Sequence, residues 1–196
     1  SFNDVFSLHP HQLQLGFLKV LPGSSIKENA VQFGIQYRNY PPYEVLQTND
    51  ISYQELLTLK QISFFIDKLY NSGRYRFCMS LMEQMWDSPS RFFEALSTNK
   101  SCDEIELSGK YGLYELLLRF TQENDPDYAG KTAAAIKLDI FSRERAHILP
   151  SFLELHITKQ NSQSIIELFK YLPEPHTASQ CHIESLDSDN YILFNK

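Results

Sequence analysis

Residues 52–73 read SYQELLTLKQISFFIDKLYNSG, and this stretch predicts a long helix whose two ends are both marked in the sequence. Ser52 and Glu55 have the spacing of a capping box, in which each side chain accepts a hydrogen bond from the other residue's backbone amide. Apolar residues then recur every three or four positions, which is the period of one helix face. Gly73 ends the pattern with a residue that takes a left-handed conformation easily. This helix indicates a mainly α domain.

The sequence after this helix continues in the same way up to a different tail. Further helices are predicted over residues 74–85, 89–96, 109–123, 125–142 and 162–171. In the tail, a polar turn at residues 187–190 separates two runs that look extended. A terminal β-hairpin is therefore expected over residues 174–196, after a helical domain over residues 52–173.

The sequence before the helix has the character of an α/β layer. Residues 9–24 read HPHQLQLGFLKVLPGS. Apolar residues occur at alternating and then at consecutive positions, which predicts a strand at about 12–21 that is covered on both faces. Such strands are usually parallel. Ser24 or Ser25 then caps a short helix that stops at Gly34. Before the strand, residues 1–8 leave no room for a helix to begin, so we expect the chain to start inside an element.

Tyrosine and proline dominate the segment between these two regions. Residues 37–51 contain Tyr37, Tyr40 and Tyr43, and the pair Pro41-Pro42 splits them. Each proline disfavours helical geometry in the residue before it. We therefore expect an irregular connector here, which marks a domain boundary and lays its tyrosines against neighbouring surface.

Composition limits the classes of partner. The chain has 196 residues, and its 18 basic and 24 acidic side chains give a net charge of −6, which disfavours nucleic acid and anionic membranes as partners. The three cysteines, Cys78, Cys102 and Cys181, are odd in number and far apart, as is typical of reduced thiols in a cytoplasmic protein. The sequence contains no run long enough to span a membrane and no secretion signal at its start.

The search for reactive side chains predicts neither catalytic nor metal-binding residues. His9 and His11 could share one side of a strand, but no third ligand lies near them, so we favour surface or packing histidines. Cys78 lies among apolar residues and is expected to be an inert buried thiol. Cys181 and His182 are adjacent and would point to opposite faces of a strand. Glycine-rich phosphate loops and nucleophile elbows do not occur in the sequence.

Several phrases together resemble a known family. They are HPHQLQLGFLKVLPGS at 9–24, RNYPPYEVLQT at 38–48, ISYQELLTLKQI at 51–62, KLYNSGRYRF at 68–77 and, more weakly, IKLDIFSRERAHILPSFLE at 136–154. These phrases are similar to the carboxy-terminal third of cobalamin-binding-domain-containing radical S-adenosylmethionine (SAM) proteins, which are Fe–S oxidoreductase-like. The resemblance implies that residues 1–36 are the end of a radical SAM (β/α) barrel, and that a helical domain of unassigned role follows the 37–51 connector.

The resemblance also implies cofactors for the intact protein. That family binds a [4Fe–4S] cluster on a Cys-x3-Cys-x2-Cys loop, with SAM on the remaining iron, and cobalamin is a further candidate cofactor. Here no two cysteines are closer than 24 positions, so no cofactor is expected on these residues alone. The upstream barrel of the same chain would be their partner. The end of the 12–21 strand would lie near the SAM adenine, which makes Leu18, Lys19, Val20 and Leu21 the cofactor-neighbour candidates. The alternative is that the three apolar residues pack against a helix, while Lys19 points outward or meets an anion.

Two functions remain open at this stage. In the first, the helical domain is an accessory lid on a radical SAM enzyme, not catalytic in isolation, with Tyr37, Tyr40 and Tyr43 as substrate-pocket candidates. In the second, it is an interaction or dimerisation module with no role in the active site, and the exposed amino-terminal strand pairs with a second copy. A third reading is a free-standing helical protein that resembles the family by accident. In either of the first two cases, residues 1–34 should pack on the helical domain or pair with another chain.

Overall fold

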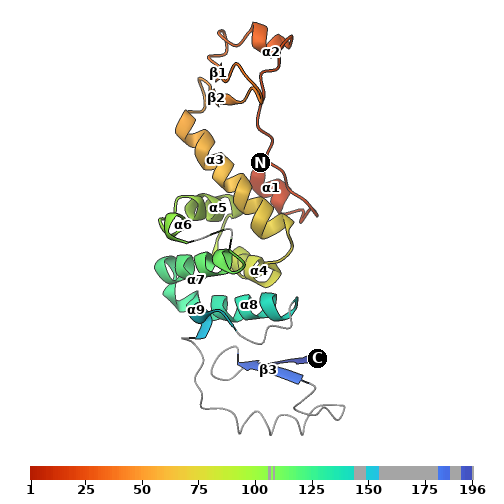
Figure 1. Cartoon of the computed structure of the whole chain (residues 1–196), viewed down its shortest axis with the longest axis vertical. Helices are drawn as coiled ribbons and strands as arrows, with labels where there is room; N and C mark the ends of the chain where they lie inside the picture. Colours follow the sequence, from red (N-terminus) through yellow and green to blue (C-terminus); the bar gives the residue numbers. More distant parts are fainter. Residues whose placement is uncertain (106, 108, 144–148, 155–180, 186–190, 196) are drawn as a thin grey trace. The chain divides into compact units, whose positions relative to one another are not determined.

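The fold of the protein is mainly helical, as the sequence predicts (Figure 1). The computed structural model describes residues 1–105, 107, 109–143, 149–154, 181–185 and 191–195. The chain divides into two compact units. Unit 1 consists of residues 1–73 and 86–99, and unit 2 consists of residues 74–85 and 100–196. Unit 1 is therefore discontinuous in sequence, because a segment of unit 2 separates its two parts.

Unit 1 is built on one long helix. Its elements are α1 (Phe2–Phe6), α2 (Ser25–Glu28), β1 (Gln36–Tyr37), β2 (Val45–Gln47), α3 (Tyr53–Phe65), the π-helix η1 (Ile66–Asn71) and α5 (Pro89–Ser97). The predicted capping box is confirmed: the Ser52 hydroxyl accepts from the Glu55 amide at 3.3 Å, and the Glu55 carboxylate accepts from the Ser52 amide at 2.8 Å. Gly73 has the predicted left-handed conformation, with φ of 60°. The last turns before it, however, are π-helical rather than α-helical.

Aromatic side chains form the core of unit 1. The ring of Phe6 lies 4.9 Å from that of Tyr70 and 6.1 Å from that of Phe93, so α1 packs against α5 and the end of η1. The expectation that residues 1–8 cannot hold a helix is wrong, because Ser1 and Asp4 form a capping box and Phe6 anchors the turn in the core. Residues 1–34 were expected to pack on the helical domain or to pair with another chain, and this contact shows the first arrangement for α1.

The predicted strand over residues 12–21 does not form as a regular strand. Its segment forms a single isolated antiparallel bridge between Lys19 and Glu44, so the expected parallel pairing is wrong. The hairpin of β1 and β2 reaches only the end of the segment, and among the described residues no strand pairs with the rest of it. The following helix is capped by Ser24, as predicted, but α2 ends at Glu28, well before the turn at Gly34.

The tyrosine-rich connector is a hairpin in unit 1. β1 pairs with β2 in antiparallel fashion, with Gln36 opposite Gln47 and an irregular register at Tyr37. The peptide bond between Pro41 and Pro42, in the loop that joins the two strands, is cis. As predicted, this segment is not helical.

Unit 2 packs three helices together. Its elements are α4 (Arg76–Met85), α6 (Ser101–Glu104), α7 (Gly112–Asn124), the 3₁₀-helix η2 (Pro126–Tyr128), α8 (Ala129–Phe141), α9 (Ser151–Glu154), β3 (Cys181–Ser185) and β4 (Tyr191–Asn195). α8 contacts both α4 and α7 (Figure 1). The predicted terminal hairpin is confirmed, because β3 and β4 pair in antiparallel register. The predicted helix over residues 162–171 lies outside the described residues. No helix in the described part of the chain is long and apolar enough to cross a membrane.

Candidate functional site

The structure brings together the two sets of site residues predicted from the sequence. The amide of Val20 donates to the Tyr43 carbonyl at 2.8 Å, and the amide of Val45 donates to the Leu18 carbonyl at 3.2 Å. The segment that contains the cofactor-neighbour candidates therefore lies alongside the segment that follows the tyrosines. Val20 is fully buried, whereas Leu18 and Leu21 are about half exposed, at 47% and 51%.

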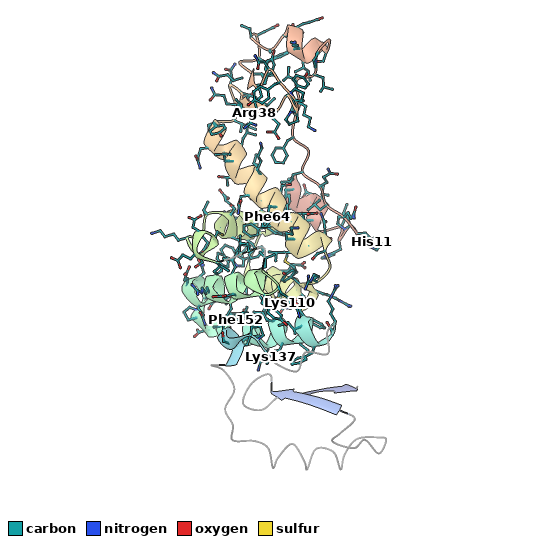
Figure 2. All side chains as sticks on the ribbon, viewed as in Figure 1. His11, Arg38, Phe64, Lys110, Lys137 and Phe152 are labelled. Atoms are coloured by element: carbon teal, nitrogen blue, oxygen red, sulfur yellow. The ribbon has the colours of Figure 1, made fainter. Side chains whose placement is uncertain are left out.

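The tyrosine loop presents one of its three rings to solvent. Tyr40 is 57% exposed, while Tyr37 and Tyr43 are half-buried. The amide of Tyr43 donates to the Tyr40 carbonyl at 2.9 Å, and Tyr43 itself has φ of 59°, which is uncommon for a residue other than glycine. The guanidinium of Arg38, labelled in Figure 2, lies 6.0 Å from the centre of the Tyr40 ring, within the range of a cation–π contact. The loop therefore holds an exposed aromatic ring in a defined position.

A cluster of charges joins this loop to α3. The ammonium of Lys60 lies 2.9 Å from a carboxylate oxygen of Glu44. The hydrogen bond from Lys60 lowers the pKa of Glu44 below its ordinary value, and the positive charges of Lys60, Arg38 and Lys19 act in the same direction. Lys19 is exposed and shares this electrostatic environment. Glu44 and Lys60 were not predicted as site residues, because they lie on different elements and no local sequence pattern connects them.

A polar groove lies next to this cluster. It has a volume of about 450 Å³ and runs between residues 12–15 and the helix formed by α3 and η1. Its lining comprises Gln12, Leu13, Gln14, Leu15, Lys60, Ser63, Phe64, Asp67 and Asn71. Phe64 is labelled on α3 in Figure 2.

Side chains at the end of η1 hold the extended segment in place. The Asn71 side chain accepts from the Leu13 amide at 2.8 Å and donates to the Leu13 carbonyl at 2.9 Å. The Tyr70 hydroxyl donates to the Pro10 carbonyl at 2.6 Å. Asn71 lies just before the predicted helix stop at Gly73, and nothing in its local sequence points to a partner 58 positions away.

Unit 2 contains a buried carboxylate with a structural role. Asp139 on α8 is 1% exposed and accepts hydrogen bonds from the amides of Phe77 and Cys78, at 2.9 and 3.0 Å, in the first turn of α4. Burial raises the pKa of Asp139, although the two amides and the Cys78 thiol oppose that shift. The prediction that Cys78 is a buried thiol is confirmed, and burial raises its pKa well above the ordinary value.

Two tyrosines share the environment of Asp139. The rings of Tyr75 and Tyr114 lie 4.4 Å apart, and the Tyr114 hydroxyl donates to the Arg74 carbonyl at 3.1 Å. Burial raises the pKa of Tyr75 to about 12 and also raises the pKa of Tyr114. Both phenols therefore keep their protons at neutral pH, which favours a packing role over acid–base chemistry.

Metal ligands do not gather in the described part of the chain. There, no group of three or more histidine, cysteine, aspartate or glutamate residues is placed to hold an ion. His9 and His11 are both exposed, and Figure 2 labels His11 in unit 1. Cys181 and His182 lie on β3, and their side chains are outside the described part.

Comparison with known families gives a match over most of the chain. A family model described as a protein of unknown function, DUF4080, matches residues 31–190. The chain belongs to the DUF4080 family. The match covers the tyrosine hairpin, the Glu44 cluster and Asp139, but it begins after the cofactor-neighbour candidates at residues 18–21. The comparisons found no matching curated protein and no matching solved structure. Membership of DUF4080 by itself names no reaction.

Proposed function

We propose that this chain is the carboxy-terminal part of a cobalamin-dependent radical SAM enzyme, and that its DUF4080 region is an accessory lid over the substrate pocket. In this proposal residues 1–36 are the edge of the enzyme's barrel. The observation that carries the proposal is the backbone pairing of residues 18–20 with residues 43–45. It holds the tyrosine hairpin beside the segment that the family resemblance assigns to the barrel.

The exposed ring of Tyr40 suits a lid better than a packing module. Binding pockets combine aromatic surface with a few polar groups, and a lid must carry such a group in a fixed position. Arg38 contacts the ring, and the backbone bond between Tyr43 and Tyr40 fixes the loop. Tyr40 is then the pocket residue of the lid, with Tyr37 and Tyr43 supporting it.

The residues present do not fit the iron–sulfur cluster. A [4Fe–4S] cluster is usually held by several closely placed thiolates, whereas Cys78 is fully buried and Cys102 lies 24 positions away. The proposal therefore assigns the cluster, SAM and cobalamin to the part of the enzyme that precedes these residues. The chain itself contributes the lid and the closing edge.

The test uses the full-length protein with its cluster reconstituted. We expect dithionite-reduced protein to cleave SAM to 5′-deoxyadenosine, and Tyr40→Ala to change the rate severalfold while iron content stays the same. Tyr128→Ala is the matched control, because Tyr128 also contacts a cation, Lys131 at 4.3 Å, but lies in unit 2. Absence of SAM cleavage in the wild type would exclude the enzyme proposal, and equal rates in both variants would exclude the lid.

One observation favours the second candidate, a docking or dimerisation module. Unit 1 has large apolar side chains that are near each other in the sequence and exposed to solvent. Among them, Val31 has an exposed fraction of 94% and Phe33 of 53%. Exposed apolar surface of this kind often marks a protein interface. If two copies pair through it, Val31→Asp should convert a dimer to a monomer in light scattering. An unchanged oligomeric state would exclude dimerisation through this surface.

A further inference from the structure

The polar groove of unit 1 has one wall made of backbone groups. Burial alternates along residues 13–18, as it does in an extended chain, and the Asn71 side chain bonds both the amide and the carbonyl of Leu13. Asn71 thus pairs with Leu13 as a neighbouring strand would. In an extended chain, residues two apart direct these groups to the same side. Leu15 and Phe17 should therefore direct theirs to the side on which Asn71 lies.

The amides and carbonyls of Leu15 and Phe17 are the next backbone groups on this side of the segment. Within the described residues, no hydrogen bond involves the amide or carbonyl of Leu15 or Phe17. Unpaired strand edges are the surfaces to which extended peptides add, with main-chain hydrogen bonds supplying affinity. The groove between Leu15 and α3 leaves space for such an addition, because its volume of about 450 Å³ is in the range of ligand sites.

The charges in the groove lining favour a cation. Lys60 is already paired with Glu44 at 2.9 Å, so these two charges largely compensate each other. Asp67 is exposed, and in the described part of the chain it makes neither an ion pair nor a hydrogen bond. Among the lining residues, its carboxylate is thus the charge without an ion-pair partner in the described part of the chain, and the nearby ammonium of Lys68 lies 6.0 Å from the centre of the Phe64 ring.

We propose that this groove binds an extended peptide segment that carries a basic side chain. The peptide adds as a strand to residues 15–17, continuing the pairing that Asn71 begins at Leu13, and its cation lies at Asp67. Phe64 supplies apolar surface for the stem of the basic side chain. One wall of the site is η1, and π-helical turns occur frequently at functional sites. This inference does not depend on the proposed lid function.

The first experiment measures binding of a defined probe to the full chain. The probe is a fluorescein-labelled, acetylated pentapeptide amide with the sequence threonine, valine, lysine, valine, threonine. We expect saturable fluorescence anisotropy. Replacing the lysine with glutamate should weaken binding by about fivefold or more, because an attractive surface charge pair becomes a repulsive one. Methylation of the peptide amides should weaken binding by about tenfold, because the peptide then loses strand hydrogen bonds.

Variants of the chain locate the site. Asp67→Asn should weaken binding of the lysine peptide by about fivefold while leaving a norleucine peptide unaffected. Asp50→Asn is the matched control, since Asp50 is also an exposed acid of unit 1 but does not line the groove. Ser63→Phe should abolish binding by filling the groove. Circular dichroism of each variant checks that the fold is kept.

Several results would overturn the proposal. One is that no peptide binds at millimolar concentration. Another is that the methylated peptide binds as well as the parent, which would indicate a site for a small cation rather than for a strand. Equal binding to the wild type, Asp67→Asn and Ser63→Phe would place the peptide elsewhere on the chain.

Discussion

Asp139 shows how one buried side chain can hold two helices together. It lies on α8, and its carboxylate accepts the amides of Phe77 and Cys78, which the first turn of α4 leaves without partners inside the helix. An anion at a helix amino terminus also interacts favourably with the helix dipole. These interactions stabilise the buried carboxylate. Removing it from water nevertheless has the larger effect on its protonation, so the pKa of Asp139 is raised.

The raised pKa predicts how stability depends on pH. A carboxyl group with a higher pKa in the folded state favours folding most when it is protonated, so its contribution falls as pH rises through the folded pKa. We expect the unfolding free energy of the wild type, relative to Asp139→Asn, to fall between about pH 4 and neutral pH. The slope cannot exceed about 1.4 kcal/mol per pH unit.

Urea unfolding at a series of pH values measures this difference. Tyr75, with its pKa raised to about 12, and Cys78, whose pKa is also raised, do not titrate in this range. Asp127→Asn is the control, because Asp127 is exposed in the same unit. A difference that rises with pH would contradict the expected direction.

Residues whose role is local could be predicted from the sequence. Ser52 and Glu55 are three positions apart, so their capping box is visible in the sequence itself. Asp139, by contrast, bonds to amides 61 and 62 positions away, and its local sequence shows only a charge among apolar residues. Such a contact depends on which helices pack together, and the spacing of apolar residues along one helix does not predict its partner.

Among the elements, the helices were predicted better than the extended segment. Caps and prolines give helix ends: Pro89 is the first residue of α5, as the sequence predicts. The π-helix was missed because its apolar residues still fit a helical period. The expected strand was wrong because both faces of its sequence look apolar, while the structure provides it with a side-chain partner, Asn71, instead of strands on both sides.

Asn71 therefore attaches the extended segment to η1, and removing the Asn71 side chain should release the segment. We expect Asn71→Ala to lower the opening free energy of this segment by about 1–2 kcal/mol, since two hydrogen bonds worth about 0.5–1.5 kcal/mol each are lost. Native-state hydrogen exchange at the Leu13 amide measures this change. Asn39→Ala is the control, because Asn39 is exposed in the same unit. Unchanged protection of Leu13 in Asn71→Ala would show that other contacts hold the segment.

At the scale of the whole chain, the core of unit 1 is completed by a helix that follows a segment of unit 2 in the sequence. Its first part ends at residue 73, and α5, which supplies Phe92, Phe93 and Leu96 to the core, comes only after α4 of unit 2. A boundary at the tyrosine connector would not divide the chain in this way, because the connector lies inside unit 1.

Fragments test this division. Residues 1–73 alone should not unfold cooperatively, because they lack the three buried side chains of α5. Burial of each side chain stabilises the folded state by about 1.5–3 kcal/mol. The sum is comparable to the whole unfolding free energy of a small domain. Residues 1–99 contain all of unit 1 and should show a cooperative thermal transition by circular dichroism. A cooperative transition in the shorter fragment, or none in the longer one, would contradict the division.

The discontinuity of unit 1 also has a consequence for synthesis on the ribosome. Residues 1–73 emerge before residues 86–99, so their core cannot close until residue 99 has been made. α4 emerges during that wait, and its main partner, α8, is not complete until residue 141. For much of translation the apolar face of α4 is therefore accessible to chaperones and to other nascent chains, and this interval is when misassembly of the two units is most probable.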